Sequence, residues 1–406
     1  MMNEDIQVLQ IGARHQYAIP RIINELGRLD VLFTDSCGAS KLGMVCSRIP
    51  RMFRPSKAAR LAERSIRGVP PEKIKSCDAI SLSELIWKRG GENSFDVLKR
   101  NLIRSKIASI AARRRIGKIP SIIYTFSREF QDYVEWSVSM GARSIVDVFI
   151  NPQTAWILER DISGTMRKVY RDYLDLERIS YERTVRNATL ILCPSEFVAR
   201  GVAEMFPDSE GKLEIVPYGS TMGQAQVRSG NETIEGRFLF VGREALRKGL
   251  DLIKEAIPKV KSTFPCAEVR IAGLNRGQLI DLFGCEPDGL TPLGNLDRNE
   301  LENEYLQADA FILPSRSEGF ASVIAEAACY GLPLLVSPQS GTPNIGGSGV
   351  IWLSTESSIT VEEGMRTILM DRRRRDELAK SSRELAHYFS EEAWKARLEE
   401  ALSKIA

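Results

Sequence analysis

Short apolar runs alternate with helical stretches along most of this chain, and this alternation is what most constrains its fold. In the first half the runs lie at residues 6–11, 31–34, 121–127, 144–149, 189–195 and 213–219. In the second half they lie at residues 237–243, 267–273, 309–314, 332–337 and 349–353. Short apolar runs bounded by turn residues are typical of buried strands, and strands that alternate with helices predict parallel sheets. We therefore expect an α/β chain with doubly wound parallel sheets.

The length and one polar stretch predict two domains. A chain of 406 residues is long enough for two cores, and residues 220–236 are polar, contain glycine and lack apolar periodicity. We expect a first Rossmann-like domain over residues 1–219, a linker over 220–236 and a second Rossmann-like domain over 237–387. The last helix, about residues 388–406, is expected to pack back on the first domain.

Composition excludes several classes of protein. Seven cysteines show no CxxC pair, and the only histidines are His15 and His387, so neither a disulfide framework nor a zinc site is expected. The acidic start of the chain is unlike a secretory signal, and no apolar stretch approaches the length of a membrane span. We expect a cytoplasmic protein without a bound metal.

Positive charge is concentrated in one region. Residues 48–118 contain 19 Lys and Arg against 6 Asp and Glu, interleaved with Ile, Leu, Met and Phe. Such a pattern fits an anionic membrane surface, which would place the protein peripherally on the inner face of the membrane, and it equally fits an ordinary solvated helix face. Nucleic acid is not expected as a partner, because stacking aromatic residues are almost absent there.

Two carboxylates in residues 314–337 are candidate ligand contacts. An apolar run ends at Pro314, and a helix is expected from Ala321 to Tyr330, so Glu318 lies in a loop at the carboxyl end of a strand, where open α/β sheets bind ligands. Glu326 follows eight residues later, which is about 12 Å of helical rise. That spacing suits a grip on two parts of one elongated ligand, with a diphosphate between them at the helix N-terminus. It is equally compatible with a helix cap and a solvated helix residue.

Two further loops supply candidate residues. Arg243 ends the strand at 237–243 and Lys248 precedes a helix, so the two cations predict a diphosphate clamp, unless they and Arg247 only decorate the surface. The first loop, Gly12 to His15, follows a nucleotide-fold start without the GxGxxG fingerprint. His15 is either a ligand contact or a structural histidine.

The second half of the chain carries a family resemblance. FVGR, RKGLDLIKEA, LGNL and PSRSEGFASVIAEAACYGLPLLVS, in this order and spacing, resemble glycosyltransferase family 4, and SEFV and VPYG resemble the segments before them. The resemblance covers about residues 175–345. It implies the GT-B fold, with two facing Rossmann-like domains and a cleft between them. It also implies a hexosyltransferase that moves a sugar, with retention and without a metal, from a nucleoside-diphosphate sugar.

The resemblance also implies roles for individual residues. Arg243 and Lys248 match the diphosphate-binding pair of the family. Glu318 and Glu326 match the two glutamates of its E-x7-E motif, the first on the donor sugar and the second on the ribose. Further donor-binding residues are expected at Gly12, Gly319, Phe320, Asn295 and Leu296.

The first half of the chain departs from the family pattern. Many members carry a Gly-Gly pair where this chain has GARH, and a histidine where it has Ser127, Arg128 and Glu129. His15 is the candidate to take over part of that catalytic task.

The donor base (UDP, GDP or ADP) stays open, as does the acceptor, which is a glycan, a lipid-linked sugar or a small molecule. No cofactor is expected. The alternatives are a noncatalytic protein that binds sugar nucleotides or glycans and a sugar-nucleotide epimerase.

Overall fold

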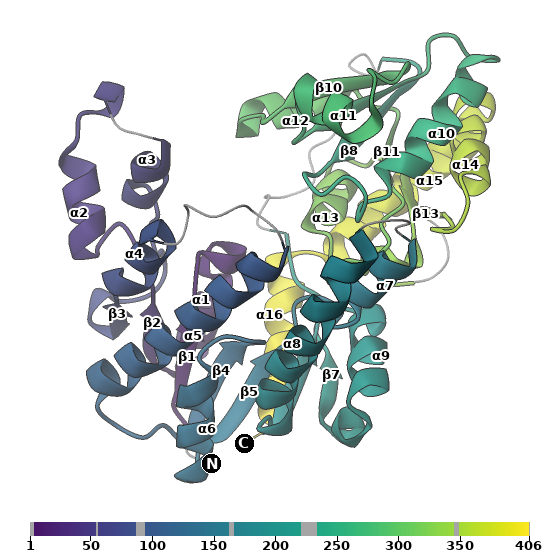
Figure 1. Ribbon diagram of the computed structural model, residues 1–406. Helices are drawn as coiled ribbons and strands as arrows, with labels where there is room; N and C mark the ends of the chain where they lie inside the picture. Colours follow the sequence, from purple (N-terminus) through teal and green to yellow (C-terminus); the bar gives the residue numbers. More distant parts are fainter. Residues whose placement is uncertain are drawn as a thin grey trace. The chain divides into compact units, whose positions relative to one another are not determined.

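The chain forms two compact units in the computed structural model, which describes residues 4–53, 56–86, 94–161, 166–220, 234–344 and 349–405 (Figure 1). Unit 1 comprises Met1–Cys193, Ala199–Ile215 and Leu398–Ala406, and unit 2 comprises Pro194–Val198 and Val216–Arg397. Most of the expected linker, residues 221–233, lies outside the described residues.

Unit 1 contains a parallel sheet with seven strands among the described residues. In order across the sheet these are β3 (Ile74–Ser76), β2 (Leu29–Thr34), β1 (Ile6–Gln10), β4 (Ile122–Phe126), β5 (Arg143–Asp147), β6 (Leu190–Cys193) and β7 (Leu213–Ile215). The helices are α1 (Ala18–Glu25), α2 (Lys41–Arg48), α3 (Ser56–Ala62), α4 (Asp78–Ile86), α5 (Ser94–Ile116), α6 (Gln131–Ser139), α7 (Thr154–Asp161), α8 (Met166–Arg186) and α9 (Glu196–Met205). The order turns back between β1 and β4, which is the doubly wound arrangement predicted from the alternation.

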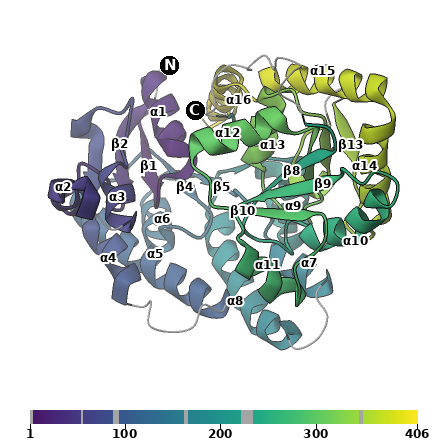
Figure 2. The ribbon, with the colours of Figure 1, turned by 90° about the horizontal axis from the view of Figure 1, so that it is seen from above.

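Unit 2 repeats this arrangement with six strands among the described residues. Their order is β10 (Leu290–Gly294), β9 (Glu268–Ala272), β8 (Arg237–Val241), β11 (Ala310–Leu313), β12 (Leu334–Val336) and β13 (Val350–Trp352), and the first three lie side by side in Figure 2. The helices are α10 (Leu250–Lys261), α11 (Arg276–Phe283), α12 (Arg298–Gln307), α13 (Ser322–Cys329), α14 (Ile359–Met370), α15 (Arg372–Tyr388) and α16 (Glu391–Ser403).

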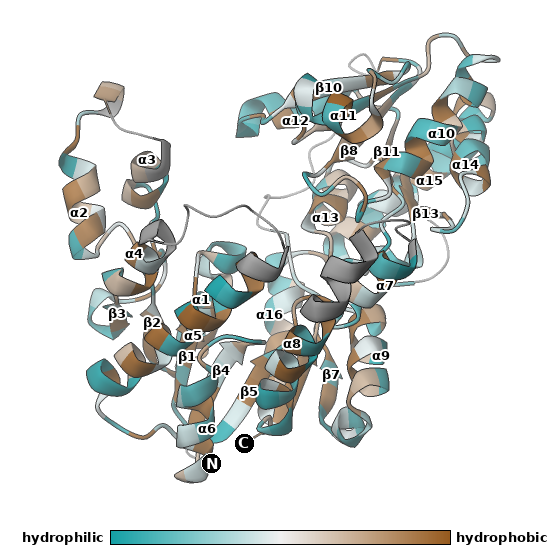
Figure 3. Ribbon diagram, viewed as in Figure 1, coloured by the Kyte–Doolittle hydropathy of each residue, from teal (hydrophilic) through white to brown (hydrophobic). Residues whose placement is uncertain are grey.

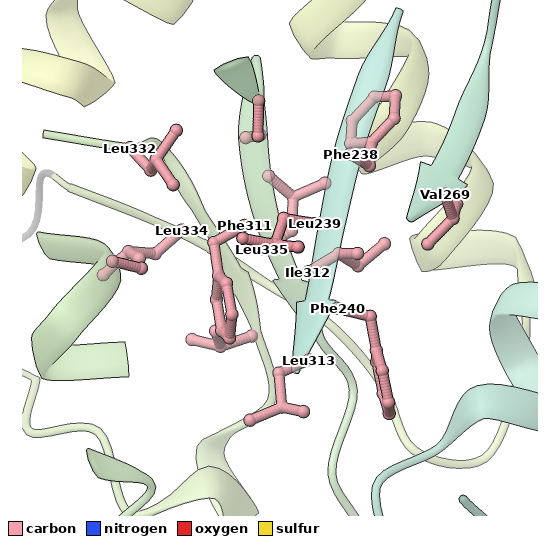
Figure 4. Close-up of a cluster of buried hydrophobic side chains, with 14 of the residues drawn as sticks. Phe238, Leu239, Phe240, Val269, Phe311, Ile312, Leu313, Leu332, Leu334 and Leu335 are labelled. Atoms are coloured by element: carbon pink, nitrogen blue, oxygen red, sulfur yellow. The ribbon is translucent and has the colours of Figure 1, made fainter. Parts of the chain in front are cut away.

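The core of unit 2 explains why its strands are continuous apolar runs. Phe238, Phe240, Phe311 and Ile312 are fully buried, and Figure 4 shows side chains from four neighbouring strands gathered in one cluster. Strands of a parallel sheet are covered on both faces, so every position along them favours an apolar residue. This burial fixes the sheet and thereby the loops at its carboxyl edge.

The end of α16 belongs to unit 1. Leu398 and Leu402 are fully buried, and the Leu402 carbonyl accepts a hydrogen bond of 3.2 Å from the Arg28 guanidinium. Lys404 forms an ion pair of 2.7 Å with Glu214. No helix among the described residues is long and apolar enough to cross a membrane.

Candidate functional site

The candidate donor site lies where the strand order of unit 2 turns back. β8 and β11 are parallel neighbours there, and the chain continues from β8 toward one edge of the sheet and from β11 toward the other. The loops that follow these two strands, residues 242–249 and 314–321, leave the sheet at the same edge. This is the position at which open α/β sheets bind ligands.

The two loops are tied together by hydrogen bonds that fix their relative position. The Arg247 carbonyl accepts hydrogen bonds from the Arg316 amide at 2.8 Å and from the Ser315 hydroxyl at 3.1 Å. The Arg316 guanidinium donates two hydrogen bonds of 2.7 Å to the Asp251 carboxylate, one to each oxygen. A two-point pair of this kind restricts orientation as well as distance, so the loop that carries Glu318 is held against the loop after β8.

Glu318 is buried between two cations. Its Oε1 lies 2.6 Å from Lys248 Nζ, and its Oε2 lies 2.8 Å from Arg247 Nη1. Burial alone would raise the pKa of the Glu318 carboxyl, but the charges of Lys248 and Arg247 outweigh burial and lower it below its ordinary value. Glu318 is therefore ionised at neutral pH, and the structure brings it together with Lys248.

Arg247 was not among the predicted site residues. Besides Glu318, its guanidinium contacts the Glu244 carboxylate at 2.6 Å and the Ser317 carbonyl at 2.6 Å. Burial opposes its charge, but the carboxylates of Glu318 and Glu244 raise the pKa of Arg247 above its ordinary value. Arg243, which the sequence singled out, is exposed instead. The adjacent cations in RKG were the available signal, but spacing could not show which of them faces Glu318.

Two glycines make this packing possible. A Cβ at Gly242 would lie 2.1 Å from Lys248 Cδ, so the lysine side chain occupies the space above the Gly242 backbone. Gly249 has φ +74°, and a Cβ there would lie 2.1 Å from the Pro314 carbonyl oxygen. Gly249 thus lets the two loops approach each other, and Gly242 leaves room for the Lys248 side chain within its own loop.

The Gly319–Phe320 segment is anchored within unit 2 just before α13. The Gly319 carbonyl accepts a hydrogen bond of 2.7 Å from the Ser195 hydroxyl, whose oxygen also accepts from the Val198 amide at 3.3 Å, so Ser195 caps α9. The Phe320 ring packs edge-on against Tyr218, with centroids 6.0 Å apart. The segments that contain SEFV and VPYG thus help to position the donor loop.

Glu326 is partly buried on α13 and has a partner that the sequence did not suggest. The Tyr305 hydroxyl donates a hydrogen bond of 3.0 Å to Glu326 Oε2, and the Tyr305 ring stacks on Tyr330 with centroids 5.1 Å apart. Burial raises the pKa of Glu326, although the hydrogen bond from Tyr305 and the charge of Arg298 act against this shift. Tyr305 therefore orients the carboxylate and favours its ionised form.

Asn295 and Leu296 follow β10 at the same edge of the sheet. Asn295 is exposed and Leu296 is half-buried, and Asp297 caps α12 directly after them through a bond of 2.9 Å from the Glu300 amide. The sequence did not predict β10, because Pro292 and Gly294 interrupt its apolar pattern. The structure places the pair at the edge expected for a nucleobase contact, and that role remains a prediction.

The first loop of unit 1 follows β1 at the point where that sheet turns back. His15, Gln16 and Tyr17 have φ of 46°, 51° and 63°, a left-handed conformation that non-glycine residues adopt at a cost. Burial, helped by the nearby Arg14 charge, lowers the pKa of His15 to about 4. The imidazole is therefore neutral at pH 7.

Two buried carboxylates hold this loop. Glu129 accepts a hydrogen bond of 2.9 Å from the Ile11 amide and pairs with the Arg14 guanidinium at 2.7 Å. Asp35 accepts one of 3.1 Å from the Gly12 amide. The segment of Ser127, Arg128 and Glu129 thus contacts the His15 loop through Glu129.

In the described part of the chain, no group of three or more His, Cys, Asp or Glu side chains is arranged to hold a metal ion. The metal-independent reaction remains a prediction, because it depends on the donor complex.

Comparison with known proteins finds similarity to glycosyltransferases in the second half of the chain. Residues 225–385 match the family model of glycosyl transferases group 1. The sulfoquinovosyl transferase of Arabidopsis thaliana is 32% identical over 156 residues, which cover 36% of this chain and 29% of that protein. The glycogen synthase of Mycobacterium tuberculosis is 28% identical over 181 residues, which cover 43% of this chain and 42% of that protein. The matches thus span less than half the length of these two relatives.

Solved structures match over nearly the whole chain. Sucrose-phosphate synthase from Thermosynechococcus elongatus aligns with a TM-score of 0.65 and 15% identity, covering 99% of each chain. The Anabaena protein HepE, solved in complex with UDP and glucose, aligns with a TM-score of 0.60 and 13% identity, covering 98% of this chain and 99% of that one. Similarity at this identity establishes the fold, and it confirms the predicted GT-B class.

Proposed function

We propose that the chain is a glycosyltransferase, because residues 225–385 match the family model of glycosyl transferases group 1, and that it transfers a sugar from a nucleoside-diphosphate sugar to an acceptor hydroxyl. The observation that carries the proposal is the buried Glu318 between Lys248 and Arg247, where the unit 2 sheet turns back. A site for an anionic sugar donor requires cations for the diphosphate and a carboxylate for the sugar hydroxyls. An exposed surface loop would not be expected to bury one carboxylate between two cations.

In this proposal the donor diphosphate binds Lys248 and Arg247, with Arg243 as a further exposed cation at the same loop. The diphosphate competes with Glu318 for its two partners, and Glu318 then accepts a hydrogen bond from a hydroxyl of the donor sugar. Glu326 accepts hydrogen bonds from the ribose. Because the related fold of HepE was solved with UDP and glucose, UDP-glucose is the first donor to test.

The proposed reaction proceeds with retention. The acceptor oxygen forms a bond to the anomeric carbon while the bond from that carbon to the diphosphate oxygen breaks, and the acceptor proton passes to the leaving diphosphate. Lys248 and Arg247 stabilise the charge that develops on the diphosphate, which is the task that a metal performs in other transferases. Front-face attack of this kind needs no nucleophile from the protein.

We assign acceptor recognition to unit 1, with the His15 loop as its candidate element. A glycan, a lipid-linked sugar and a small molecule remain candidate acceptors. His15 is neutral at pH 7, so its imidazole can accept or donate a hydrogen bond at a sugar hydroxyl without adding charge.

Replacement of Lys248 tests the proposal. Lys248→Ala removes one of two cations at the diphosphate, and we expect kcat to fall by about 100-fold or more with an unchanged circular dichroism spectrum. The matched control is Lys259→Ala, since Lys259 lies on α10 and pairs only loosely with Glu362, at 3.8 Å. Full activity of Lys248→Ala would disprove the role assigned to this residue.

A noncatalytic donor-binding protein is the second candidate, and the unit 1 site supports it. The family resemblance implies a histidine where this chain has Ser127, Arg128 and Glu129, and the Glu129 carboxylate is already paired with Arg14. Calorimetry with UDP, GDP and ADP sugars, followed by product analysis, separates the two functions. Binding without hydrolysis, transfer or isomerisation for any donor and acceptor pair would favour the binding protein.

A further inference from the structure

The segment that contains α2 and α3 has no acidic residue over a long stretch. From Ser36 to Ala62 the chain contains six Lys and Arg and no Asp or Glu. Cations at the described exposed positions include Lys41, Arg48 and Arg60. The described surface of this segment therefore carries positive charge, and the segment has no carboxylate of its own to neutralise it.

Apolar side chains are exposed within the same segment. The exposed fractions are 47% for Met44, 57% for Val45, 82% for Met52 and 71% for Phe53. Large apolar residues of this kind are usually buried, and four of them within ten residues form a patch rather than scattered exposure. Figure 3 shows hydrophobic and hydrophilic residues alternating along α2.

The helical geometry of α2 combines charge and apolar surface on one face. Lys41, Met44, Val45 and Arg48 are spaced at i, i+3, i+4 and i+7, which places them along one stripe of the helix. The opposite face is occupied by the fold, because Gly43 and Cys46 are buried. The exposed stripe thus has two apolar side chains between two cations.

This segment is anchored to the rest of unit 1, so the patch is presented on a folded element. Ser40 caps α2 through a bond of 3.1 Å from the Gly43 amide, and the Leu42 amide donates to Asp78 at 3.0 Å. Arg64, just after α3, pairs with the buried Asp35 at 2.6 Å. These contacts with unit 1 leave the stripe of Lys41, Met44, Val45 and Arg48 exposed to solvent.

We propose that residues 41–53 form a docking surface for anionic phospholipid, with Met44, Val45, Met52 and Phe53 inserted among the lipid headgroups and the flanking cations on the lipid phosphates. Interfacial helices combine an apolar strip with Lys and Arg, as this segment does. The other basic part of the region, α5, buries Leu98, Ala108, Ala112 and Ile116, and its exposed apolar residues Val97 and Ile110, at 38% and 46%, are less exposed than Met44, Val45, Met52 and Phe53. The proposal narrows the predicted membrane contact within the basic region and is independent of the transferase reaction.

Cosedimentation of the full chain with vesicles tests the proposal. We expect binding to equimolar phosphatidylcholine and phosphatidylglycerol, weak binding to phosphatidylcholine alone, and loss of binding as salt rises. The double variant Met52→Ser/Phe53→Ser should lower the partition coefficient about tenfold or more, because it removes apolar area from the interface. Lys41→Gln/Arg48→Gln should lower it about fivefold for each charge.

Matched controls come from unit 2. Ile359→Ser/Met370→Ser removes apolar side chains that are 57% and 72% exposed on α14, and Arg372→Gln/Arg373→Gln removes two cations of α15. Both controls should bind vesicles like wild type, and so should the Lys248→Ala variant, which separates docking from catalysis.

Insertion has its own readout. Phe53→Trp should be quenched by brominated phospholipid beyond the quenching of wild type. Absence of vesicle binding at low salt would overturn the proposal. So would unchanged binding of Met52→Ser/Phe53→Ser, or binding of single-stranded RNA through these residues in place of vesicles.

Discussion

Tyr305 is the residue that most clearly tests the Glu326 assignment. Its hydroxyl donates to Glu326 at 3.0 Å, and this bond opposes the effect of burial, which raises the pKa of Glu326. Tyr305→Phe removes the bond, so the pKa of Glu326 should rise further. We expect the KM for the donor to increase about fivefold with little change in kcat, because one hydrogen bond contributes about 1 kcal/mol.

The pH profile distinguishes this effect from simple damage to the core. As pH falls, a smaller fraction of Glu326 is ionised in Tyr305→Phe than in wild type, so the KM ratio of variant to wild type should widen toward acidic pH. Tyr330→Phe is the control, since it keeps the stacked ring pair without touching the Tyr305–Glu326 bond. An unchanged KM across the pH range would refute the role of Tyr305.

For single residues, the sequence predicted which residues lie in the site better than which of them contact one another. It pointed to Glu318 and Lys248, which lie 2.6 Å apart, but it missed Arg247, which lies 2.8 Å from Glu318. The diphosphate contact assigned to Arg243 remains a prediction. Which cation of a loop turns inward depends on the side-chain space left by glycines such as Gly242, and spacing along the chain does not contain that information. Tyr305 was missed for the same reason, because it reaches Glu326 only through the packing of α12 on the sheet.

At the scale of elements, the pair between Asp251 on α10 and Arg316 holds the Glu318 loop. Asp251→Asn leaves the largely buried Arg316 guanidinium without its charged partner, and we expect a loss of about 2 kcal/mol in the stability of unit 2. Because the loop then positions Glu318 less well, kcat should fall about tenfold. Thermal melting and steady-state kinetics measure the two effects.

The control for this pair is an exposed one. Asp288→Asn breaks the Lys261–Asp288 pair of 2.6 Å, in which the Asp288 side chain is 75% exposed. Exposed pairs contribute little to stability, so neither melting nor kcat should change measurably. Equal behaviour of the two variants would contradict a positioning role for Asp251.

The His15 loop predicts a pH dependence of stability. The pKa of His15 is about 4 in the folded protein and 6.5 in an unfolded chain, so the unfolded state binds the proton first as pH falls. The folded state therefore loses stability between pH 6.5 and about 4, by at most about 3.5 kcal/mol. His15→Asn has no titrating ring and tolerates the left-handed backbone, so its melting temperature should fall less over this range. If the melting temperatures of wild type and variant fell equally over this pH range, His15 would not be neutral and buried in the folded protein.

Elements were predicted from sequence where burial leaves a continuous apolar run. The long run at β11 and the helix α13 after it were both expected near their observed bounds. β3 and β10 were not, because the first has three half-buried residues and the second contains Pro292 and Gly294. The left-handed turn at residues 15–17 was also missed, because non-glycine residues rarely adopt this conformation and local propensity does not predict it.

At the scale of the whole molecule, the chain returns to unit 1 for its last residues. Leu398 and Leu402 are fully buried although the preceding part of α16 belongs to unit 2. This arrangement predicts that a substitution near the C-terminus lowers the stability of unit 1. Leu402→Ala should lower the stability of unit 1 by about 2–5 kcal/mol, as expected for a leucine truncated in a core.

Hydrogen exchange locates this loss. In Leu402→Ala, amide protection should fall in β1 and β5 of unit 1 and remain in β8 and β11 of unit 2. Leu378→Ala, which truncates a fully buried leucine of α15, should produce the reverse pattern. The C-terminal residues pack on unit 1, where the chain also begins, so their loss should affect unit 1 first. A uniform loss of protection across both sheets in either variant would instead mean that the two units unfold together, and the prediction of separate unfolding would be wrong.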